Sequence, residues 1–412
     1  APTTINHLYR FQGKPGQQFF FDVLQVSQAN QFRYRLVDPY GNVLFTRSSL
    51  ADFESEPVLA EGLYTLLIEP LISVAAEHSY SLTIVPVVNL HSELAIDELV
   101  IAKVPTPGAT HHFSFRLDEP RNLAFDSLTN SSVFSWSLIG AHGAVVSDRR
   151  FDRSDSHLQA DPILRLAAGE YSLSVTGSGD NVSDQIAFRL MDLAGAEPIE
   201  LGVPFSGQID PPKSALLYRF DASVGNAFFF DMVSLSTSAN FGSYRLIDPF
   251  GRPVGSVNDL IDQKPTPLAY DGTYTLMLEG RISNTATIDF QMNVQPILVD
   301  RQPLGLWQVF TGSLATAGAQ REHPFEIPGR ARVFLDVLGF VGSATTWSLF
   351  GPSGQLVADR RLDLTNGQAN FNPVLDLHPG SYTLRVGATG DSTGNYSLRL
   401  IALADSQATA LG

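Results

Sequence analysis

The chain carries the stretch Tyr34-Arg35-Leu36-Val37-Asp38-Pro39-Tyr40-Gly41 and, 210 residues further on, the near copy Tyr244-Arg245-Leu246-Ile247-Asp248-Pro249-Phe250-Gly251. Each copy predicts a strand that ends in a tight turn, because proline fixes φ and glycine accepts a positive φ. A different pair of segments, Trp136-Ser137-Leu138 and Trp347-Ser348-Leu349, alternates with these copies. The chain therefore repeats in the order A, B, A, B, and its fold has to be understood one unit at a time.

The A and B units also share a skeleton with each other, so the period is about the length of one ordinary domain. Each unit has an apolar run that ends in Asp, at Asp22, Asp126, Asp231 and Asp336. We expect four domains, at residues 1–92, 93–198, 199–298 and 299–412. Because Leu403–Gly412 aligns with Leu193–Gly202, which opens the second A unit, we expect the chain to end at the start of a further repeat and to be a segment of a longer array.

Short alternating runs broken by Gly, Pro, Asn and Asp indicate an all-β protein. In Tyr64–Glu69, for example, Tyr64, Leu66 and Ile68 share one face of a strand. No segment keeps helical periodicity over three turns. The sequence therefore predicts four tandem β-sandwich domains of the jelly-roll or immunoglobulin-like kind.

A Gly-x-Tyr motif recurs at the corresponding position of all four units, at Gly62/Tyr64, Gly169/Tyr171, Gly272/Tyr274 and Gly380/Tyr382. Glycine can turn the chain into a strand, and the tyrosine can bury its ring while its hydroxyl bonds a nearby backbone group, as in a tyrosine corner. We interpret the motif as structural, so replacing Tyr274 by Phe should cost stability rather than binding.

The composition excludes several classes of protein. The chain of 412 residues has no cysteine, which rules out disulfides and thiolate chemistry. Its formal net charge of −15 makes nucleic acid an unsuitable partner, although an acidic surface can hold divalent cations. No apolar run is long enough to span a membrane as a helix.

The succession Tyr-x-Phe, Gly-x-x-Phe-x-Phe-Asp, Tyr-Arg-Leu-x-Asp-Pro-x-Gly, Gly-x-Tyr-Thr-Leu and Tyr-Ser-Leu-Thr resembles the bacterial pre-peptidase C-terminal (PPC) domain. All four units resemble it, the A units better than the B units. The resemblance implies small jelly-roll-like sandwiches and an extracellular or bacterial-surface location, as in repeat arrays or beside secreted peptidases. Members beside collagenases bind substrate and can bind calcium, but the corresponding linkers here carry few acidic residues, with Asp210 alone at the second A unit.

Calcium is the one cofactor that the residues suggest. Acidic residues are spaced three or four apart in the B units, at Asp148, Asp152 and Asp155 in the first and at Asp359 and Asp363 in the second. Such oxygen ligands suit calcium, but neighbouring arginines favour a salt-bridged loop instead. For the Asp that closes each apolar run, the alternatives are a cation ligand, an ion pair with an Arg such as Arg35 or Arg245, and an acceptor of backbone N–H bonds.

Aromatic residues at expected loop tips, Tyr40, Phe53 and Phe250, are candidates for stacking on a sugar or a peptide. The alternative is that they form apolar patches between neighbouring domains.

Catalysis is not expected. The nine histidines have no counterparts between like units, and neither His-Glu-x-x-His nor Gly-x-Ser-x-Gly occurs. The sequence therefore predicts a non-catalytic stalk or adhesive scaffold whose partners are neighbouring repeats. The alternative is a module that binds carbohydrate or a matrix or host protein, with a further possibility of an accessory region of a secreted hydrolase.

Overall fold

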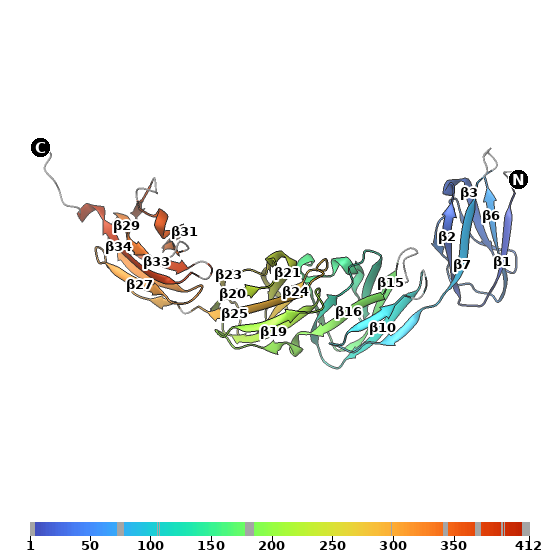
Figure 1. Cartoon of the computed structure of the whole chain (residues 1–412), viewed down its shortest axis with the longest axis horizontal. Helices are drawn as coiled ribbons and strands as arrows, with labels where there is room; N and C mark the ends of the chain where they lie inside the picture. Colours follow the sequence, from blue (N-terminus) through green and yellow to red (C-terminus); the bar gives the residue numbers. More distant parts are fainter. Residues whose placement is uncertain are drawn as a thin grey trace. The chain divides into compact units, whose positions relative to one another are not determined.

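The computed structural model describes residues 5–71, 78–104, 106, 108–177, 185–297, 299–340, 345–366, 372–388, 390 and 392–405. In these residues the regular structure consists of β-strands and one-turn 3-10 helices, without an α-helix. The strands form eight sheets, which pair into sandwiches along the chain (Figure 1). The predicted all-β fold of several β-sandwich domains is confirmed. The expected start of a further repeat lies mostly in residues 406–412, which are outside the described part.

The first domain, an A unit, pairs a sheet in the order β1-β6-β3-β4 with a sheet in the order β5-β2-β7. Its strands alternate inward-facing aromatic and aliphatic residues with polar ones, as a half-solvated sandwich requires. The elements are β1 (His7–Gly13), β2 (Gln18–Val26), η1 (Ala29–Gln31), β3 (Phe32–Val37), β4 (Val43–Arg47), β5 (Phe53–Glu54), β6 (Gly62–Pro70) and β7 (Tyr80–Val87).

The second domain, a B unit, pairs the sheets β13-β12-β15-β10-β8 and β14-β11-β16-β9. Its elements are β8 (Leu90–Glu93), β9 (Val100–Lys103), β10 (Thr110–Leu117), β11 (Arg121–Ser127), β12 (Phe134–Gly140), β13 (Gly143–Arg150), η2 (Phe151–Arg153), η3 (Ser156–Leu158), β14 (Ile163–Leu166), β15 (Gly169–Gly177), β16 (Gln185–Asp192) and η4 (Leu193–Gly195).

The third domain, the second A unit, pairs the sheets β17-β19-β24-β21-β22 and β18-β25-β20-β23. Its elements are β17 (Glu197–Pro198), β18 (Phe205–Ile209), β19 (Ala215–Ala222), β20 (Ala227–Leu235), η5 (Ala239–Phe241), β21 (Gly242–Ile247), β22 (Pro253–Asp259), β23 (Gln263–Pro267), β24 (Gly272–Gly280) and β25 (Ile288–Pro296).

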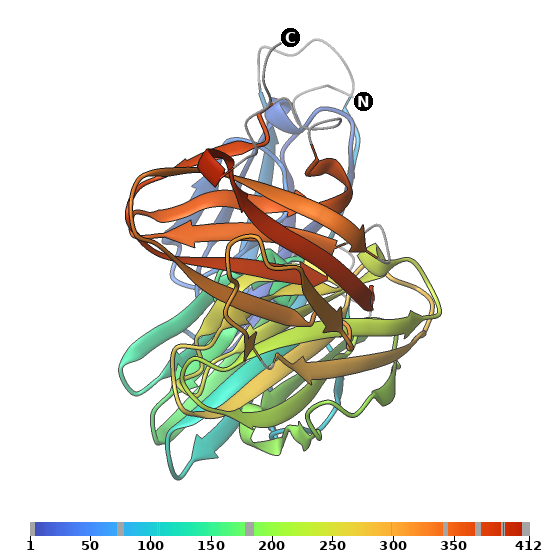
Figure 2. The ribbon, with the colours of Figure 1, turned by 90° about the vertical axis from the view of Figure 1, so that its left-hand side faces the viewer.

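The fourth domain, the second B unit, pairs the sheets β26-β28-β33-β30-β31 and β27-β34-β29-β32, whose strands are orange and red in Figure 2. Its elements are β26 (Asp300–Arg301), β27 (Phe310–Leu314), β28 (Gln320–Ile327), β29 (Ala331–Phe340), β30 (Thr345–Gly351), β31 (Gly354–Arg361), η6 (Leu362–Leu364), β32 (Val374–Leu377), β33 (Gly380–Ala388), β34 (Gly394–Ala402) and η7 (Leu403–Asp405).

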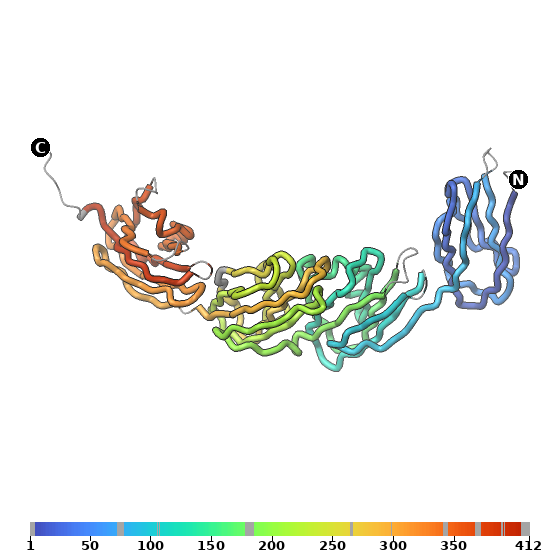
Figure 3. The backbone as a smooth tube through the Cα atoms, viewed as in Figure 1, coloured from blue at the N-terminus to red at the C-terminus, as the bar shows by residue number. Residues whose placement is uncertain are grey.

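Each domain has its own apolar core between its two sheets, and in Figure 3 each domain keeps to its own range of colour along the chain. The chain divides into two compact units, Ala1–Gly195 and Ala196–Gly412, so that each unit holds one A and one B domain. No helix in the described part of the chain is both long and apolar enough to cross a membrane.

The Gly-x-Tyr motif forms the predicted tyrosine corner in all four domains. Every tyrosine hydroxyl donates to the carbonyl four residues earlier, at 2.8 Å for Tyr64, 2.9 Å for Tyr171, 3.0 Å for Tyr274 and 2.8 Å for Tyr382. The preceding glycines have φ between +133° and +152°, a conformation in which a side chain would be strained. The repeated motif is therefore a structural element that closes each sandwich.

Candidate functional site

The aromatic residues of the two A-unit turns lie at corresponding positions but in different surroundings. Tyr40 has 78% of its surface exposed. Phe250 is 54% exposed, lies edge-on to Tyr270 at 5.1 Å between ring centres, and has the Arg252 guanidinium 4.9 Å from its own ring centre. Tyr40 therefore offers the more open ring for stacking on a ligand.

The predicted turns are present, and each is held by an aspartate. Asp38 accepts backbone N–H bonds from Tyr40 at 2.9 Å and from Asn42 at 2.7 Å. A hydrogen bond from the Asn42 side chain, with the backbone bonds, lowers the pKa of Asp38. Asp248 accepts the equivalent bonds from Phe250 and Arg252. The rings at the turn tips are thus carried on a well-braced backbone.

Phe53 does not lie at a loop tip. It belongs to the short strand β5, where its ring is 4.7 Å from that of Phe45 and 6.5 Å from that of Phe21. The guanidinium of Arg47 covers it at 3.8 Å from the ring centre. The expectation of a loop-tip position was wrong because the strand pairs with β2, which turns the ring toward the core.

The acidic loops of the B units are built around arginine and serine. Asp152 accepts from Arg150 Nε at 2.9 Å, and Asp363 accepts from Arg361 Nε at 2.9 Å, which lowers the pKa of Asp363. Asp148 and Asp359 have φ of +46° and +41° and accept from serine hydroxyls, at 2.5 Å from Ser135 and 3.2 Å from Ser348. Asp155 is fully buried, with a carboxylate oxygen 3.5 Å from His157 Nδ1.

These loops are also tied to the cores by tryptophan. Trp136 Nε1 donates to Ser154 Oγ at 2.9 Å, and Trp347 Nε1 donates to Thr365 Oγ1 at 2.7 Å. Among the described residues, no three His, Cys, Asp or Glu side chains gather closely enough to hold a metal. The geometry favours a braced, salt-bridged loop. Calcium binding by the five aspartates stays a prediction, and melting with calcium and with EDTA tests it.

In the B units the Asp that closes the apolar run forms an ion pair with an arginine. In the B units Asp126 accepts from Arg189 at 2.7 Å, and Asp336 accepts from Arg399 at 2.7 Å. Each arginine lies directly opposite its aspartate on the neighbouring strand. The pairing is therefore a cross-strand contact between central strands of the sheet, which sequence spacing of 63 residues does not reveal.

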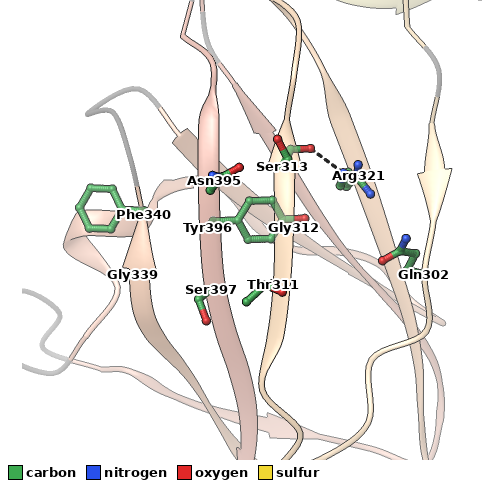
Figure 4. A pocket seen from close by; sticks show the side chains of 10 residues that line it. All are labelled: Gln302, Thr311, Gly312, Ser313, Arg321, Gly339, Phe340, Asn395, Tyr396 and Ser397. Atoms are coloured by element: carbon green, nitrogen blue, oxygen red, sulfur yellow. Dashed lines mark hydrogen bonds between the residues drawn. The ribbon is translucent and has the colours of Figure 1, made fainter.

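The fourth domain has a groove of about 770 Å³ lined by residues of β27, β34 and β29 and by Arg321 of β28, which belongs to the other sheet. Figure 4 shows its polar side chains, which are Gln302, Thr311, Ser313, Arg321, Asn395 and Ser397, with Phe340 at one side. Arg321 Nε donates to the Ser313 carbonyl at 2.6 Å. Beneath them the Tyr396 ring packs against Gly312, where an added Cβ would lie 2.4 Å from the ring.

The third domain has the corresponding groove, of about 780 Å³, across β18, β25 and β20. Its polar side chains are Ser206, Gln208, Ser234, Ser236, Asp289 and Gln291. Gln208 Nε2 donates to Asp289 Oδ1 at 2.6 Å, so these two side chains of the groove already bond each other. In both domains the third strand of the groove has a register shift, between Asp231 and Ser234 in β20 and between Val337 and Gly339 in β29.

Hydroxyl and amide groups beside an exposed aromatic ring can hydrogen-bond and stack on a sugar or a peptide. His323, which bonds the Tyr396 hydroxyl at 2.7 Å below this groove, is fully buried. Burial lowers the pKa of His323, which keeps it neutral near pH 7. The sequence analysis missed both grooves, although the glycine at the centre of residues 310–314 and the alternating polar residues of 394–402 mark the fourth-domain groove.

Comparison with known proteins identifies no family. No protein-family model matches the chain, and no curated protein matches it. It is similar to solved structures of the CUB1-EGF-CUB2 domain of human MASP-1/3, with 9% identity and a TM-score of 0.18 over 47% of this chain and 99% of that one. The CUB1-EGF-CUB2 domains of rat MASP-1 give 8% identity and a TM-score of 0.18, over 49% of this chain and 99% of that one.

Lac15 from a marine microbial metagenome gives 10% identity and a TM-score of 0.14, over 78% of this chain and 93% of that chain. Likenesses of this size carry no argument about function. The β-sandwich fold rests on the sheets and cores described above.

Proposed function

We propose that this chain is a non-catalytic array of β-sandwich domains that serves as a stalk or scaffold in an extracellular or cell-surface protein. We also propose that the domains are of the PPC kind, as the sequence resemblance implies, and that the protein lies outside the cell or on its surface. It is supported by the features that the repeats share, which are structural: tyrosine corners in all four domains, braced turns in the two A units and cross-strand ion pairs in the two B units. Its partners are the neighbouring repeats.

One contact, found in both compact units, carries the proposal. Phe20 and Phe229 occupy equivalent positions in the triplets Phe19–Phe21 and Phe228–Phe230. The outer two phenylalanines of each triplet belong to the domain core, but Phe20 and Phe229 do not, since they point to the opposite face of the strand. They are nevertheless only 7% and 2% exposed.

Within each unit the following B domain places a glycine beside this ring. A Cβ added at Gly108 would lie 3.2 Å from the Phe20 ring, and one added at Gly318 would lie 2.4 Å from the Phe229 ring. Both glycines have positive φ, +75° and +66°. The same contact between an A domain and the following B domain thus occurs twice. In each, a glycine turn of the B domain packs against a phenylalanine that is not part of the A-domain core. Repeating such a joint is how an array limits bending between its domains.

The experiment is to replace Phe229 by Ala in the full chain and measure the distance distribution between spin labels on the third and fourth domains. We expect the distribution to broaden, because the joint loses its apolar contact, while the melting transitions of the two cores stay nearly unchanged. The matched control is Val233→Ala, an exposed position on the same strand. An unchanged distribution in Phe229→Ala would contradict a joint that limits bending.

The grooves favour a second function, binding of carbohydrate or protein. Asn395, Ser397 and Thr311 present polar groups next to the partly exposed Phe340 ring. Screening the chain against glycans and matrix proteins tests this function, with Asn395→Ala for the groove and Tyr40→Ala with Phe250→Ala for the turns. If the chain binds a glycan or a protein reproducibly and any of these variants abolishes that binding, the binding function would be favoured over a purely mechanical one.

A further inference from the structure

Two histidine rings lie side by side on one sheet of the second domain. His91 of β8 is directly opposite His112 of β10, because the two strands pair in parallel with these residues in register. The ring centres are 4.9 Å apart, and the ring planes differ by only 12°. Since β8 is the edge strand of its sheet, the two rings bridge an edge strand and its neighbour.

The adjacent histidine of β10, His111, has a different role. It is buried, its Nε2 lies 2.9 Å from Ser92 Oγ, and its Nδ1 lies 3.4 Å from the Lys103 carbonyl oxygen. Both of its nitrogens are therefore in use. His91 and His112 lie on the opposite face of the sheet, because successive side chains of a strand alternate. Within the described residues neither of these two rings takes part in a hydrogen bond, so their nitrogens can bind a ligand from solvent.

The fourth domain has an ion pair at the place of this histidine pair. Arg301 of the edge strand β26 lies opposite Glu322 of β28, and its Nε donates to a Glu322 oxygen at 2.9 Å. The two places correspond because, three residues further along the edge strand, a leucine N–H bonds the neighbouring strand in both domains, at Leu94 and Leu304. Opposite charges thus tie the edge strand of the fourth domain to its sheet. Two histidines cannot form such a tie, since neither carries a negative charge.

Imidazole nitrogens are, however, good ligands for Cu²⁺, Ni²⁺ and Zn²⁺. An ion about 2 Å from each of two nitrogens, at roughly a right angle, holds them about 3 Å apart. The broad χ2 preference of histidine lets the exposed His91 ring tilt toward His112 at little cost. Glu93 lies two residues along β8 on the same face and adds negative charge nearby. On its other side His112 faces the uncharged Ser174, where the fourth domain has Arg385.

We propose that His91 and His112 form a binding site for one divalent transition-metal ion of the kind that prefers imidazole, with Cu²⁺ bound most tightly, and that this ion ties β8 to β10. Water takes the remaining coordination positions. The ion has the role that the Arg301–Glu322 ion pair has in the fourth domain. Only residues 88–89 separate β8 from β7, so the ion fixes the strand by which the chain enters the second domain. This site is independent of whether the array acts as a scaffold or as a binding module.

The test of the site is a titration of the full chain with Cu²⁺ near neutral pH, followed by electron paramagnetic resonance. We expect a Cu²⁺ signal with two imidazole nitrogens. His91→Ala should weaken binding by about a hundredfold, because the second imidazole is already held beside the first. The matched control is His142→Ala, at an exposed histidine in the turn between β12 and β13 of the same domain, which should leave the affinity unchanged.

Hydrogen exchange of the β8 amides tests the tie. At a free Cu²⁺ concentration ten times the dissociation constant, exchange should slow by about tenfold, because β8 can leave the sheet only after the ion is released. The double variant His91→Arg with His112→Glu puts the residues of the fourth-domain ion pair at this place. It should bind Cu²⁺ no better than His91→Ala, and its β8 exchange should not respond to Cu²⁺.

Three outcomes would overturn the proposal. Equal Cu²⁺ affinity in the original chain and in His91→Ala would exclude this pair as the site, and so would a signal with fewer than two imidazole nitrogens. Tight binding that leaves β8 exchange unchanged would exclude the tie. A Cu²⁺ effect on β8 that persists in the double variant would place the ion at other residues.

Discussion

The first and third domains are two copies of one A unit, and they differ most where they begin. Both have the braced Asp-Pro turn and the tyrosine corner, and both have the outward-facing phenylalanine covered by the next domain. Of the two, only the third has among the described residues a lead-in, the segment of β17 and β18 that adds one strand to each of its two sheets. Its last strand, β25, is buried, whereas β7 of the first domain is half exposed. The comparison shows that turns and corners are local properties, whereas burial of the last strand depends on the lead-in.

The largest effect should come from making the third domain resemble the first. Replacing residues 196–209 by a Gly-Ser linker of equal length would uncover Leu217, Tyr218, Phe290, Met292 and Val294 in part. Burying a large apolar side chain contributes about 1.5 to 3 kcal/mol, so partial exposure of five should lower the free energy of unfolding of the third domain by about 4 kcal/mol. Denaturant unfolding, with hydrogen exchange to assign the transition, measures it.

The control for that replacement is Val203→Ser, an exposed position within the same segment. It should leave the third domain close to its original stability. If the linker chain kept β25 protected, burial of the last strand would not depend on the lead-in, and the comparison of the two domains would fail.

A smaller effect is expected from one methyl group at the centre of the lead-in. Gly207→Ala would place a Cβ 2.6 Å from Phe290 Cζ and 2.7 Å from the Tyr218 hydroxyl oxygen. Forcing an extra carbon into a packed site costs about 2 kcal/mol. Thermal or denaturant unfolding of the third domain measures the loss. Gly329→Ala is the control, because a Cβ there meets nothing within 4 Å; equal effects of the two would show that the packing around Gly207 is not tight.

Removing the corner hydroxyl should affect both domains alike. Tyr64→Phe and Tyr274→Phe each leave a carbonyl and an N–H four residues earlier without their bonds, so each should lower the free energy of unfolding of its domain by about 1 kcal/mol. Tyr40→Phe, at an exposed ring, is the control. A loss confined to the third domain would mean that the corner depends on the lead-in after all.

Local chemistry explains which features could be predicted from the sequence. The strands, the turn at Asp38 and the corner at Tyr64 depend on residues within a few positions of one another, so their patterns are visible in the chain. The same holds for the acidic B loops, where Arg150 lies two residues from Asp152.

Features that depend on strand pairing could not be predicted from the sequence. The partner of Asp126 is Arg189, which only the register of β11 and β16 brings opposite it. Phe53 was placed at a loop tip because its pairing with β2 cannot be seen in the sequence. The grooves combine three strands that are far apart in the chain, so their polar residues look like ordinary exposed positions until the sheet is assembled.

The smallest expected effect is on the pH dependence of the first-domain turn at Asp38. The pKa of Asp38 is lowered by the Asn42 side chain and nearby backbone N–H groups, so ionised Asp38 favours the folded state. A lowered folded-state pKa gives stability that is present above the unfolded value near 3.9 and is lost as pH falls through the folded-state pKa. Asp38→Asn should therefore flatten the fall in melting temperature of the first domain on going from pH 5 to pH 2, by less than any change above, since the carboxylate is exposed. Asp248→Asn, followed in the third domain, is the matched variant. Parallel melting curves for the original chain and Asp38→Asn over this pH range would show that the turn owes its stability to proline and glycine rather than to the charge on Asp38.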